Sequence, residues 1–169
     1  METINFTSKV YITTTESLKQ LLNSCKQCSK ITNIITRDML TDLNIKKNID
    51  NKSAIIINTL TSTEEKEIGH WVTMCIDWKL KEAILVNSLK QIDNSLTKTV
   101  KKFCKLNHLN FHIINLGSQQ KLSNNCGYHC KFVIHTFHLH GIKRLFKIRR
   151  IFDKFSAKTI ENFVKKNLI

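Results

Sequence analysis

The segment CGYHCKFVIHTFHLHG at residues 126–141 constrains the fold more than any other part of the chain. It is apolar on nearly every side, which is typical of a helix that other elements enclose. Gly141 is suited to ending that helix. A chain of 169 residues, 41% of them hydrophobic, is long enough to bury it, and we expect a single domain over residues 1–169.

Short apolar runs rich in β-branched residues come before this helix and predict a sheet. Four runs are expected to be strands, at 54–60, 71–78, 83–89 and 111–116. A helix is expected between the last two strands, with Asp93 as its N-cap. The chain thus contains a strand meander with one inserted helix.

Helices are also expected at both ends of the chain. Apolar residues at helical spacing predict a helix over 14–30 that opens with a capping box from Thr13 to Glu16, and a second short helix begins near Thr36 or Arg37. One or two helices are expected after residue 141, the last capped by Ser156. Helices, then strands, then helices is the order of an α+β fold.

Charge and composition limit the setting of the protein. The chain carries 27 basic and 13 acidic residues, a net charge of +14, which favours polyanionic partners such as nucleic acid. No stretch has the roughly 20 apolar residues that a membrane span needs, and the N-terminus lacks the pattern of a secretion signal. We therefore expect no membrane association and no secretion, and we expect the six cysteines to be free thiols.

The cysteines allow a metal site as well as a nucleophile. Cys25 and Cys28 have the spacing of zinc ligands or of a redox pair, and three residues near the apolar helix could complete a site: Cys126, His129 and Cys130. However, Cys25 and Cys28 fall inside the expected helix 14–30, without the tight glycine-containing turn of a metal knuckle. This favours ordinary thiols at both positions.

Cys126 stands where a nucleophile could be activated. It follows a polar loop and begins the apolar helix, so that backbone N–H groups and the helix dipole would favour its thiolate. His70 heads an expected strand and could act as the base, and the side-chain oxygen of Asn87 could accept its Nδ1–H. Asp77 is excluded because it lies seven residues along the same strand, roughly 23 Å away. Gln119 and Gln120 could each donate an N–H to an oxyanion.

Three segments follow one another in an order that resembles a known family. GHWVTMCID (69–77), ILVNSLK (84–90) and GSQQKLSNNCGYHCKFVIH (117–135) supply in turn a histidine, an amide residue, a glutamine and a Cys-Gly pair. This order is similar to that of the adenovirus-protease (adenain) and SUMO-protease clan of cysteine peptidases, and especially to the maturation proteases of Polinton elements and virophages. ITRDML (35–40) resembles the segment before that family's first strand, and ENFVKKNL (161–168) resembles its closing helix.

The resemblance implies a fold and a set of roles. The fold is papain-like, with a small mixed or antiparallel sheet between helices and the nucleophile at the start of the central buried helix. The implied roles are His70 as general base, Asn87 as orienting residue, Gln119 (alternatively Gln120) as oxyanion donor, Cys126 as nucleophile, and Trp71 and Gly127 as parts of the substrate cleft. This family usually has Asp or Glu where this chain has Asn87.

The function implied is that of a cysteine endopeptidase that cleaves capsid or other virion precursors through a thioester intermediate, without a metal or organic cofactor. Adenovirus relatives are activated by DNA and by a peptide, and no residue here establishes either activator. A monomer in the virion and the infected host cell is expected, with a protein substrate and DNA as partners. Two alternatives remain open: an isopeptidase for SUMO or another ubiquitin-like protein, and a non-enzymatic basic nucleic-acid-binding protein.

Overall fold

A five-stranded mixed sheet forms the centre of the computed structural model, which describes residues 14–45, 51–64, 69–120 and 123–166. The strands lie in sequence order: β1 (Thr32–Thr36), β2 (Lys52–Asn58), β3 (Trp71–Asp77), β4 (Glu82–Asn87) and β5 (Asn110–Asn115). The two outer pairs, β1 with β2 and β4 with β5, are parallel, and the inner pairs are antiparallel. The β4–β5 pair is parallel because helix α3 (Asn94–Leu106) crosses between them.

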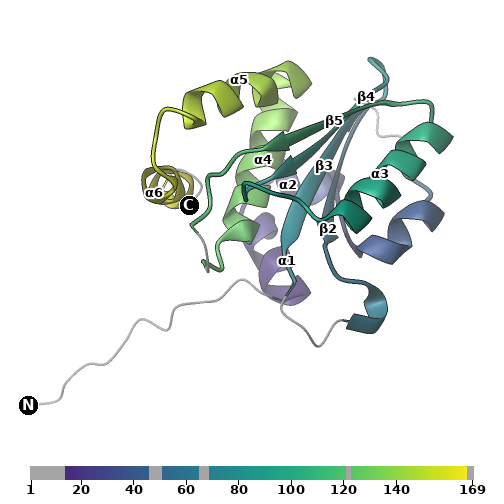
Figure 1. Ribbon diagram of the computed structural model, residues 1–169, viewed down its shortest axis with the longest axis horizontal. Coiled ribbons are helices and arrows are strands. Elements are labelled where there is room, and N and C mark those ends of the chain that lie inside the picture. Colours follow the sequence, from purple (N-terminus) through teal and green to yellow (C-terminus); the bar gives the residue numbers. More distant parts are fainter. Residues whose placement is uncertain (1–13, 46–50, 65–68, 121–122, 167–169) are drawn as a thin grey trace, which may run out of the picture.

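Helices cover both faces of the sheet (Figure 1). Side chains alternate along β3, so that Val72, Met74 and Ile76 face α3 and the 3-10 helix η1 (Arg37–Asp42). Trp71 and Cys75 face the other way, toward α4 (Cys126–His140). Both faces of the inner strands are therefore buried, which explains why these strands are apolar runs without a polar face.

Helix α4 is enclosed, as its composition predicts. Its buried side chains meet the sheet, the short helices α1 (Thr15–Asn23) and α2 (Cys28–Ile31), and the C-terminal helices α5 (Ile142–Phe152) and α6 (Ala157–Lys166). Gly141 ends α4 with a positive φ of 73°, a conformation that favours glycine. The α+β class and the small mixed sheet between helices are confirmed, with Cys126 at the N-terminus of the central helix.

Most of the expected elements are present. The four expected strands correspond to β2–β5, and the Asp93 carboxylate caps α3 by accepting from the N–H groups of Ser95 and Leu96. The Ser156 hydroxyl accepts the Thr159 N–H at the start of α6. The helix expected from Thr36 or Arg37 is the 3-10 helix η1.

Three expectations near the N-terminus were wrong. The expected helix 14–30 is two helices, because α1 ends at Asn23 and residues 24–27 form turns before α2. The N-cap is Thr14, and its capping box closes on Ser17 rather than running from Thr13, which lies outside the described residues, to Glu16. Strand β1 was not predicted, so the segment ITRDML overlaps the first strand instead of preceding it.

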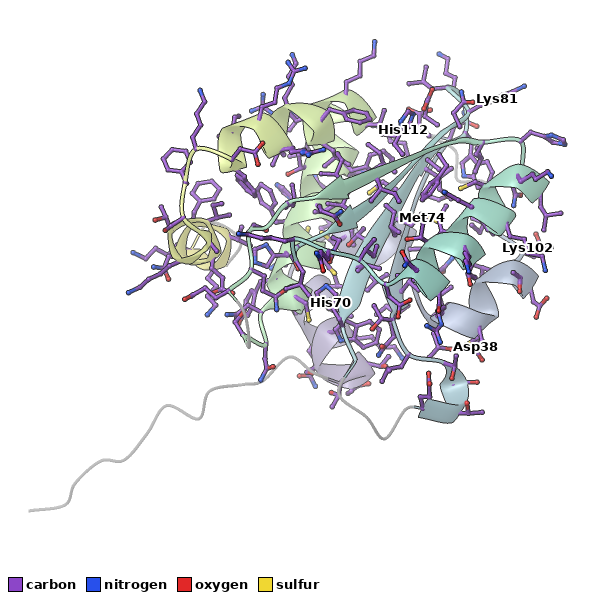
Figure 2. All side chains as sticks on the ribbon, viewed as in Figure 1. Asp38, His70, Met74, Lys81, Lys102 and His112 are labelled. Carbon is purple, nitrogen blue, oxygen red and sulfur yellow. The ribbon has the colours of Figure 1, made fainter. Side chains whose placement is uncertain are left out.

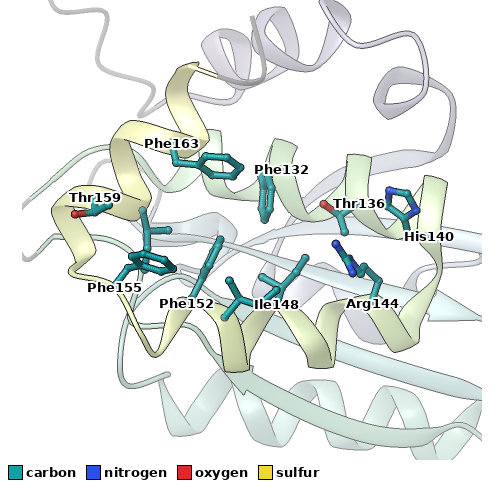
Figure 3. Close-up of a pocket in the computed structure, with 11 residues that line it drawn as sticks. Phe132, Thr136, His140, Arg144, Ile148, Phe152, Phe155, Thr159 and Phe163 are labelled. Atoms are coloured by element: carbon teal, nitrogen blue, oxygen red, sulfur yellow. The ribbon is translucent and has the colours of Figure 1, made fainter.

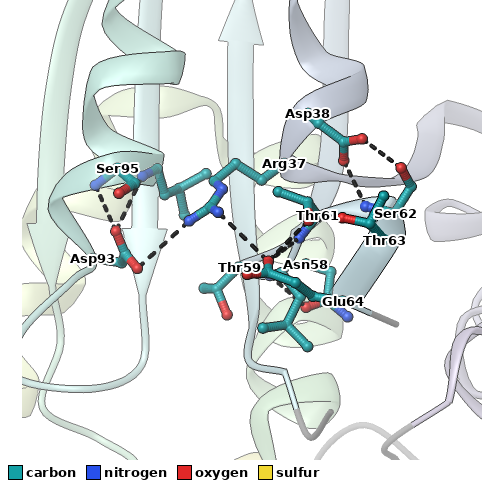
Figure 4. Close-up of polar contacts among 12 residues, drawn as sticks. Arg37, Asp38, Asn58, Thr59, Thr61, Ser62, Thr63, Glu64, Asp93 and Ser95 are labelled. Carbon is teal, nitrogen blue, oxygen red and sulfur yellow. Dashed lines mark hydrogen bonds and ion pairs between the residues drawn. The ribbon is translucent and has the colours of Figure 1, made fainter. Parts of the chain in front are cut away.

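A polar network holds the loops at one end of the sheet (Figure 4). The Arg37 guanidinium lies 3.6 Å from carboxylate oxygens of both Glu64 and Asp93, and so joins the loop after β2 to the cap of α3. The Asp38 carboxylate accepts from the Ser62 N–H at 2.9 Å and from its hydroxyl at 2.5 Å, and this hydroxyl bond is the main reason that the pKa of Asp38 is lowered to about 2. This network fixes residues 60–64, which follow β2.

A mostly apolar cavity of about 440 Å³ lies away from this end, between α4, α5 and α6 (Figure 3). Phe132, Phe152 and Phe163 line it, with Arg144 and His140 at one side. Among the described residues, no helix is long and apolar enough to cross a membrane.

Candidate active site

The backbone of His70 is fixed by the end of the neighbouring strand. The His70 N–H donates to the Thr59 hydroxyl at 3.0 Å, and the His70 carbonyl accepts from the Thr59 N–H at 2.9 Å. Gly69 precedes it, and a Cβ at that position would collide with the amide of Asn58. These contacts fix the backbone that carries the imidazole, directly before β3 at the end of the sheet (Figure 2).

The His70 ring is hydrogen-bonded to Asn87, the last residue of β4. Its Nε2 lies 2.8 Å from Asn87 Oδ1. Sequence reasoning named Asn87 correctly as a neighbour of the ring but assigned the wrong nitrogen, because it used Nδ1–H as the donor. The ring rotation that decides between the two nitrogens depends on packing at the end of the sheet, which periodicity does not report.

The partners of the Asn87 amide determine the His70 tautomer. Asn87 is fully buried, and its Nδ2 donates to the carbonyl oxygens of Leu89 and Gln91 and to the side-chain oxygen of Asn115, at 3.2, 2.8 and 3.1 Å. Because carbonyl oxygens only accept, Nδ2 must face them and Oδ1 must face the imidazole. His70 Nε2 therefore carries the hydrogen, and Nδ1 is left as the basic nitrogen.

Burial lowers the pKa of His70, and the hydrogen bond to Asn87 opposes this shift only in part. The imidazole is therefore neutral at neutral pH. A neutral ring with a hydrogen on Nε2 is a proton acceptor at Nδ1, which is the form that a general base requires.

Cys126 begins α4 beside the His70–Trp71 peptide. Burial raises the pKa of its thiol above 9, although hydrogen bonds from the backbone N–H groups of Trp71, Gly127 and Cys126 itself act in the opposite direction. The donors predicted from the helix start are thus present. These N–H groups favour the thiolate as expected, but the loss of solvation outweighs them, because Cys126 is only 6% exposed.

The two glutamines point in different directions. Gln119 is buried beside Ser88, whose hydroxyl donates to its Oε1 at 2.6 Å, while its Nε2 donates to the Ser123 carbonyl at 2.5 Å. An amide nitrogen has two hydrogens, so Gln119 retains one for another acceptor. Gln120 instead donates from Nε2 to Glu161 of α6 at 2.7 Å.

Glu161 organises the loop before Cys126 and was missed as a site residue by sequence reasoning. Its carboxylate accepts from the Ser123 hydroxyl and from both the backbone and the side chain of Gln120. Burial raises its pKa, but the hydrogen bonds from Ser123, Gln120 and Asn125 outweigh this effect and the net shift is downward. A charged residue on an otherwise amphipathic helix carries no sequence signal that distinguishes a buried carboxylate from an exposed one.

The remaining predicted site residues lie around Cys126. Trp71 is only 3% exposed and packs in the same core cluster as Cys126, so it contributes a backbone N–H and a packed ring, not an exposed cleft wall. Gly127 is also buried. His129 accepts or donates at Nδ1 with the Ser118 hydroxyl, 3.1 Å away, behind the loop that carries Gln119. We refer to His70, Asn87 and Cys126 as the Cys126 cluster.

The possible metal ligands do not assemble as the sequence suggested. Among the described residues, one group of thiols and imidazoles has its ligand atoms within 4.8 Å of one another, and it consists of Cys25, Cys28 and His135. We refer to these three residues as the Cys25 cluster. Cys126, His129 and Cys130 are not part of it. The reason given against a metal was also wrong, because Cys25 lies in the turn between α1 and α2 and not within a continuous helix.

Comparison with known proteins gives a likeness of fold only. No family model and no curated protein matches the chain. A solved structure of the SUMO protease Ulp1 with its catalytic cysteine oxidised to a sulfinic acid is 17% identical, with a TM-score of 0.48 over 88% of this chain and 77% of that one. The C-terminal Ulp1 protease domain in complex with Smt3, the yeast orthologue of SUMO, is 14% identical, with a TM-score of 0.46 over 90% and 76%. Sequence identities and TM-scores this low carry no information about the chemistry of this chain.

Proposed function

We propose that this protein is a cysteine endopeptidase whose nucleophile is Cys126. The observation that carries the proposal is the hydrogen bond between His70 Nε2 and the buried amide of Asn87, which leaves Nδ1 as the basic nitrogen. The backbone N–H of the next residue, Trp71, lowers the pKa of the Cys126 thiol, which supports a base and a thiol at the same end of the sheet. The order of the same residues in the sequence matches the resemblance to the adenovirus-protease and SUMO-protease clan.

The chemistry follows from the neutral thiol and imidazole. As the Cys126 sulfur attacks the peptide carbonyl carbon, His70 Nδ1 takes the thiol proton, and the carbonyl oxygen becomes an oxyanion that accepts from Gln119 and from the Cys126 N–H. His70 returns the proton to the leaving amine, which leaves a thioester. His70 then takes a proton from water as water attacks the thioester, and the proton passes to the departing sulfur.

We further propose that the substrates are capsid or other virion precursor proteins, cleaved in the virion or the infected host cell by a monomer. This proposal rests on the resemblance to viral and Polinton-type maturation proteases. The test is a panel of capsid-precursor peptides with small residues near the scissile bond, set against SUMO and ubiquitin reporters that end in di-glycine. Cleavage of the precursor peptides alone is expected, and cleavage of the reporters alone would make the protein an isopeptidase.

DNA is a second proposed partner, favoured by helix α5. Its described exposed positions include Lys143, Arg144, Lys147, Arg149 and Arg150, which form a basic surface. Such a surface attracts nucleic acid in a manner that weakens with salt. Cleavage measured with and without DNA across a salt series tests whether DNA is an activator: a stimulation that salt abolishes is expected, and an unchanged rate excludes it.

A further inference from the structure

The Cys25 cluster joins two parts of the molecule that are far apart in the sequence. Cys25 lies in the turn after α1 and Cys28 begins α2, whereas His135 belongs to α4. The Cys25 sulfur lies 3.5 Å from His135 Nδ1 and 2.6 Å from the Cys28 sulfur. The Cys28 N–H also donates to the Cys25 sulfur, at 3.4 Å. Two sulfurs and an imidazole nitrogen therefore converge on one point between the N-terminal helices and α4.

We propose that Cys25, Cys28 and His135 bind a Zn²⁺ ion. Two thiolates and one imidazole are ligands that zinc prefers, and a tetrahedral ion would take its fourth ligand from solvent. Solvent can reach the cluster because Cys25 and His135 are only partly buried, whereas Cys28 is buried. The site is separate from the Cys126 cluster and needs no peptidase activity.

Three ligand atoms define three edges of a tetrahedral site: the Cys25–His135 edge fits, the Cys25–Cys28 edge requires a change, and the Cys28–His135 edge is at most 4.8 Å. Zn–S bonds of about 2.3 Å and Zn–N bonds of about 2.0–2.1 Å give a sulfur-to-nitrogen edge of about 3.5 Å and a sulfur-to-sulfur edge of about 3.8 Å. The Cys25–His135 distance of 3.5 Å matches the first edge. The two sulfurs, 2.6 Å apart, must separate by about 1 Å when the metal binds.

Zinc binding would also change the charge of its own ligands. Binding of Zn²⁺ releases the two thiol protons, and the resulting unit of one Zn²⁺ and two thiolates has no net charge.

The experiment uses the full chain with the Cys126→Ala substitution, reduced and free of metal, so that the proposed nucleophile cannot contribute. Co²⁺ is added as the probe, because a tetrahedral cobalt–thiolate centre has intense charge-transfer and ligand-field absorption bands. One equivalent is expected to bind, and added Zn²⁺ is expected to displace it. His135→Gln, a change at a partly buried residue, should weaken binding by more than the 10–100-fold that loss of an outer-shell partner causes.

A matched control is Cys104→Ser, which removes a free thiol of α3, on the opposite face of the sheet. It is expected to bind Co²⁺ as the parent does, while Cys25→Ser is expected to lose the charge-transfer bands. Bands that persist unchanged in both Cys25→Ser and His135→Gln would overturn the proposal. It would also be overturned if the reduced parent bound no metal and mild oxidation instead joined Cys25 to Cys28 in a disulfide, which mass spectrometry detects.

Discussion

Helix α4 contributes one residue to each of two clusters of sulfur and imidazole that contain the same kinds of residue in different surroundings. In the Cys126 cluster, one sulfur stands at the start of α4, and the imidazole of His70 is held through Nε2 by a buried amide. In the Cys25 cluster, two sulfurs lie in contact and the imidazole of His135 faces one of them directly. The first arrangement leaves a basic nitrogen available for a proton, and the second directs three ligand atoms at one point.

This difference shows that the surroundings of an imidazole determine its chemistry more than the presence of a nearby cysteine. An amide that accepts from one ring nitrogen fixes the tautomer and leaves the other nitrogen basic. A second sulfur supplies the negative charge that a metal ion requires. Burial raises the thiol pKa in both clusters, so the pKa of the cysteine alone does not distinguish a nucleophile from a ligand.

The largest expected effect is the complete loss of peptide cleavage without any loss of metal binding. Cys126→Ala should abolish peptide cleavage because it removes the sulfur that forms the proposed thioester, and it should retain the cobalt bands of the Cys25 cluster. Cys104→Ser, on the far side of the sheet, should retain both properties. Cleavage of a precursor peptide and cobalt absorption, measured on the same preparations, provide the test. Residual turnover in Cys126→Ala would remove Cys126 from its proposed role.

A large effect is also expected at Asn87, where the family usually has a carboxylate. Three oxygen atoms surround the Asn87 Nδ2, so Asn87→Asp would place a carboxylate oxygen against three acceptors in a fully buried position. We expect Asn87→Ala to lower kcat several-fold to about a hundredfold, and Asn87→Asp to lower it at least as much.

The matched control for Asn87→Asp is Asn94→Asp at the exposed start of α3, which should leave kcat unchanged. A faster Asn87→Asp enzyme would show that the added negative charge helps the imidazolium more than the lost hydrogen bonds harm the site. In that case the amide would not be what distinguishes the Cys126 cluster.

The sequence predicted those parts of the site that depend on local pattern. The continuous apolar character of α4 and the strand that ends at Asn87 are visible in the sequence, and the polar loop before Cys126 marks the helix start. The break between α1 and α2 is not visible, because apolar residues continue at helical spacing through Cys25 and no glycine interrupts them. Strand β1 is a short run directly after a helix, and only its pairing with β2 identifies it.

Contacts across the fold were beyond the reach of the sequence. His135 meets Cys25 only because the turn after α1 packs on the middle of α4, and sequence reasoning instead grouped the CxxC pair with residues at the start of α4. The hydrogen bond at His70 Nε2 and the burial of Glu161 were missed for the same reason. Each depends on how elements distant in the sequence meet, and neither residue type nor spacing contains that information.

The pH dependence of cleavage tests the protonation states of the Cys126 cluster. On the acid side, kcat/KM is expected to fall by about tenfold per pH unit. Because burial lowers the pKa of His70 below 6.5 and raises that of Cys126 above 9, the working form has a neutral Cys126 thiol and a neutral His70 imidazole. The value of kcat/KM should therefore stay level at neutral pH and fall only below pH 6.5, as His70 takes up a proton. A fall on the alkaline side of neutrality, from loss of an imidazolium, would instead indicate a resting ion pair.

The smallest effect concerns stability and the helix that the two clusters share. Burial lowers the pKa of His129 from 6.5 to about 4, with Glu161 opposing the shift and His70 and Lys165 adding to it. Above pH 6.5 His129 is neutral in the folded and unfolded chains and contributes nothing to the pH dependence. Between pH 6.5 and about 4 the unfolded chain binds a proton that the folded chain does not, so the free energy of unfolding should fall by up to ~3 kcal/mol. Urea unfolding at several pH values should show this loss, and His129→Gln should reduce it; an equal loss in the variant would assign the acid sensitivity to other groups.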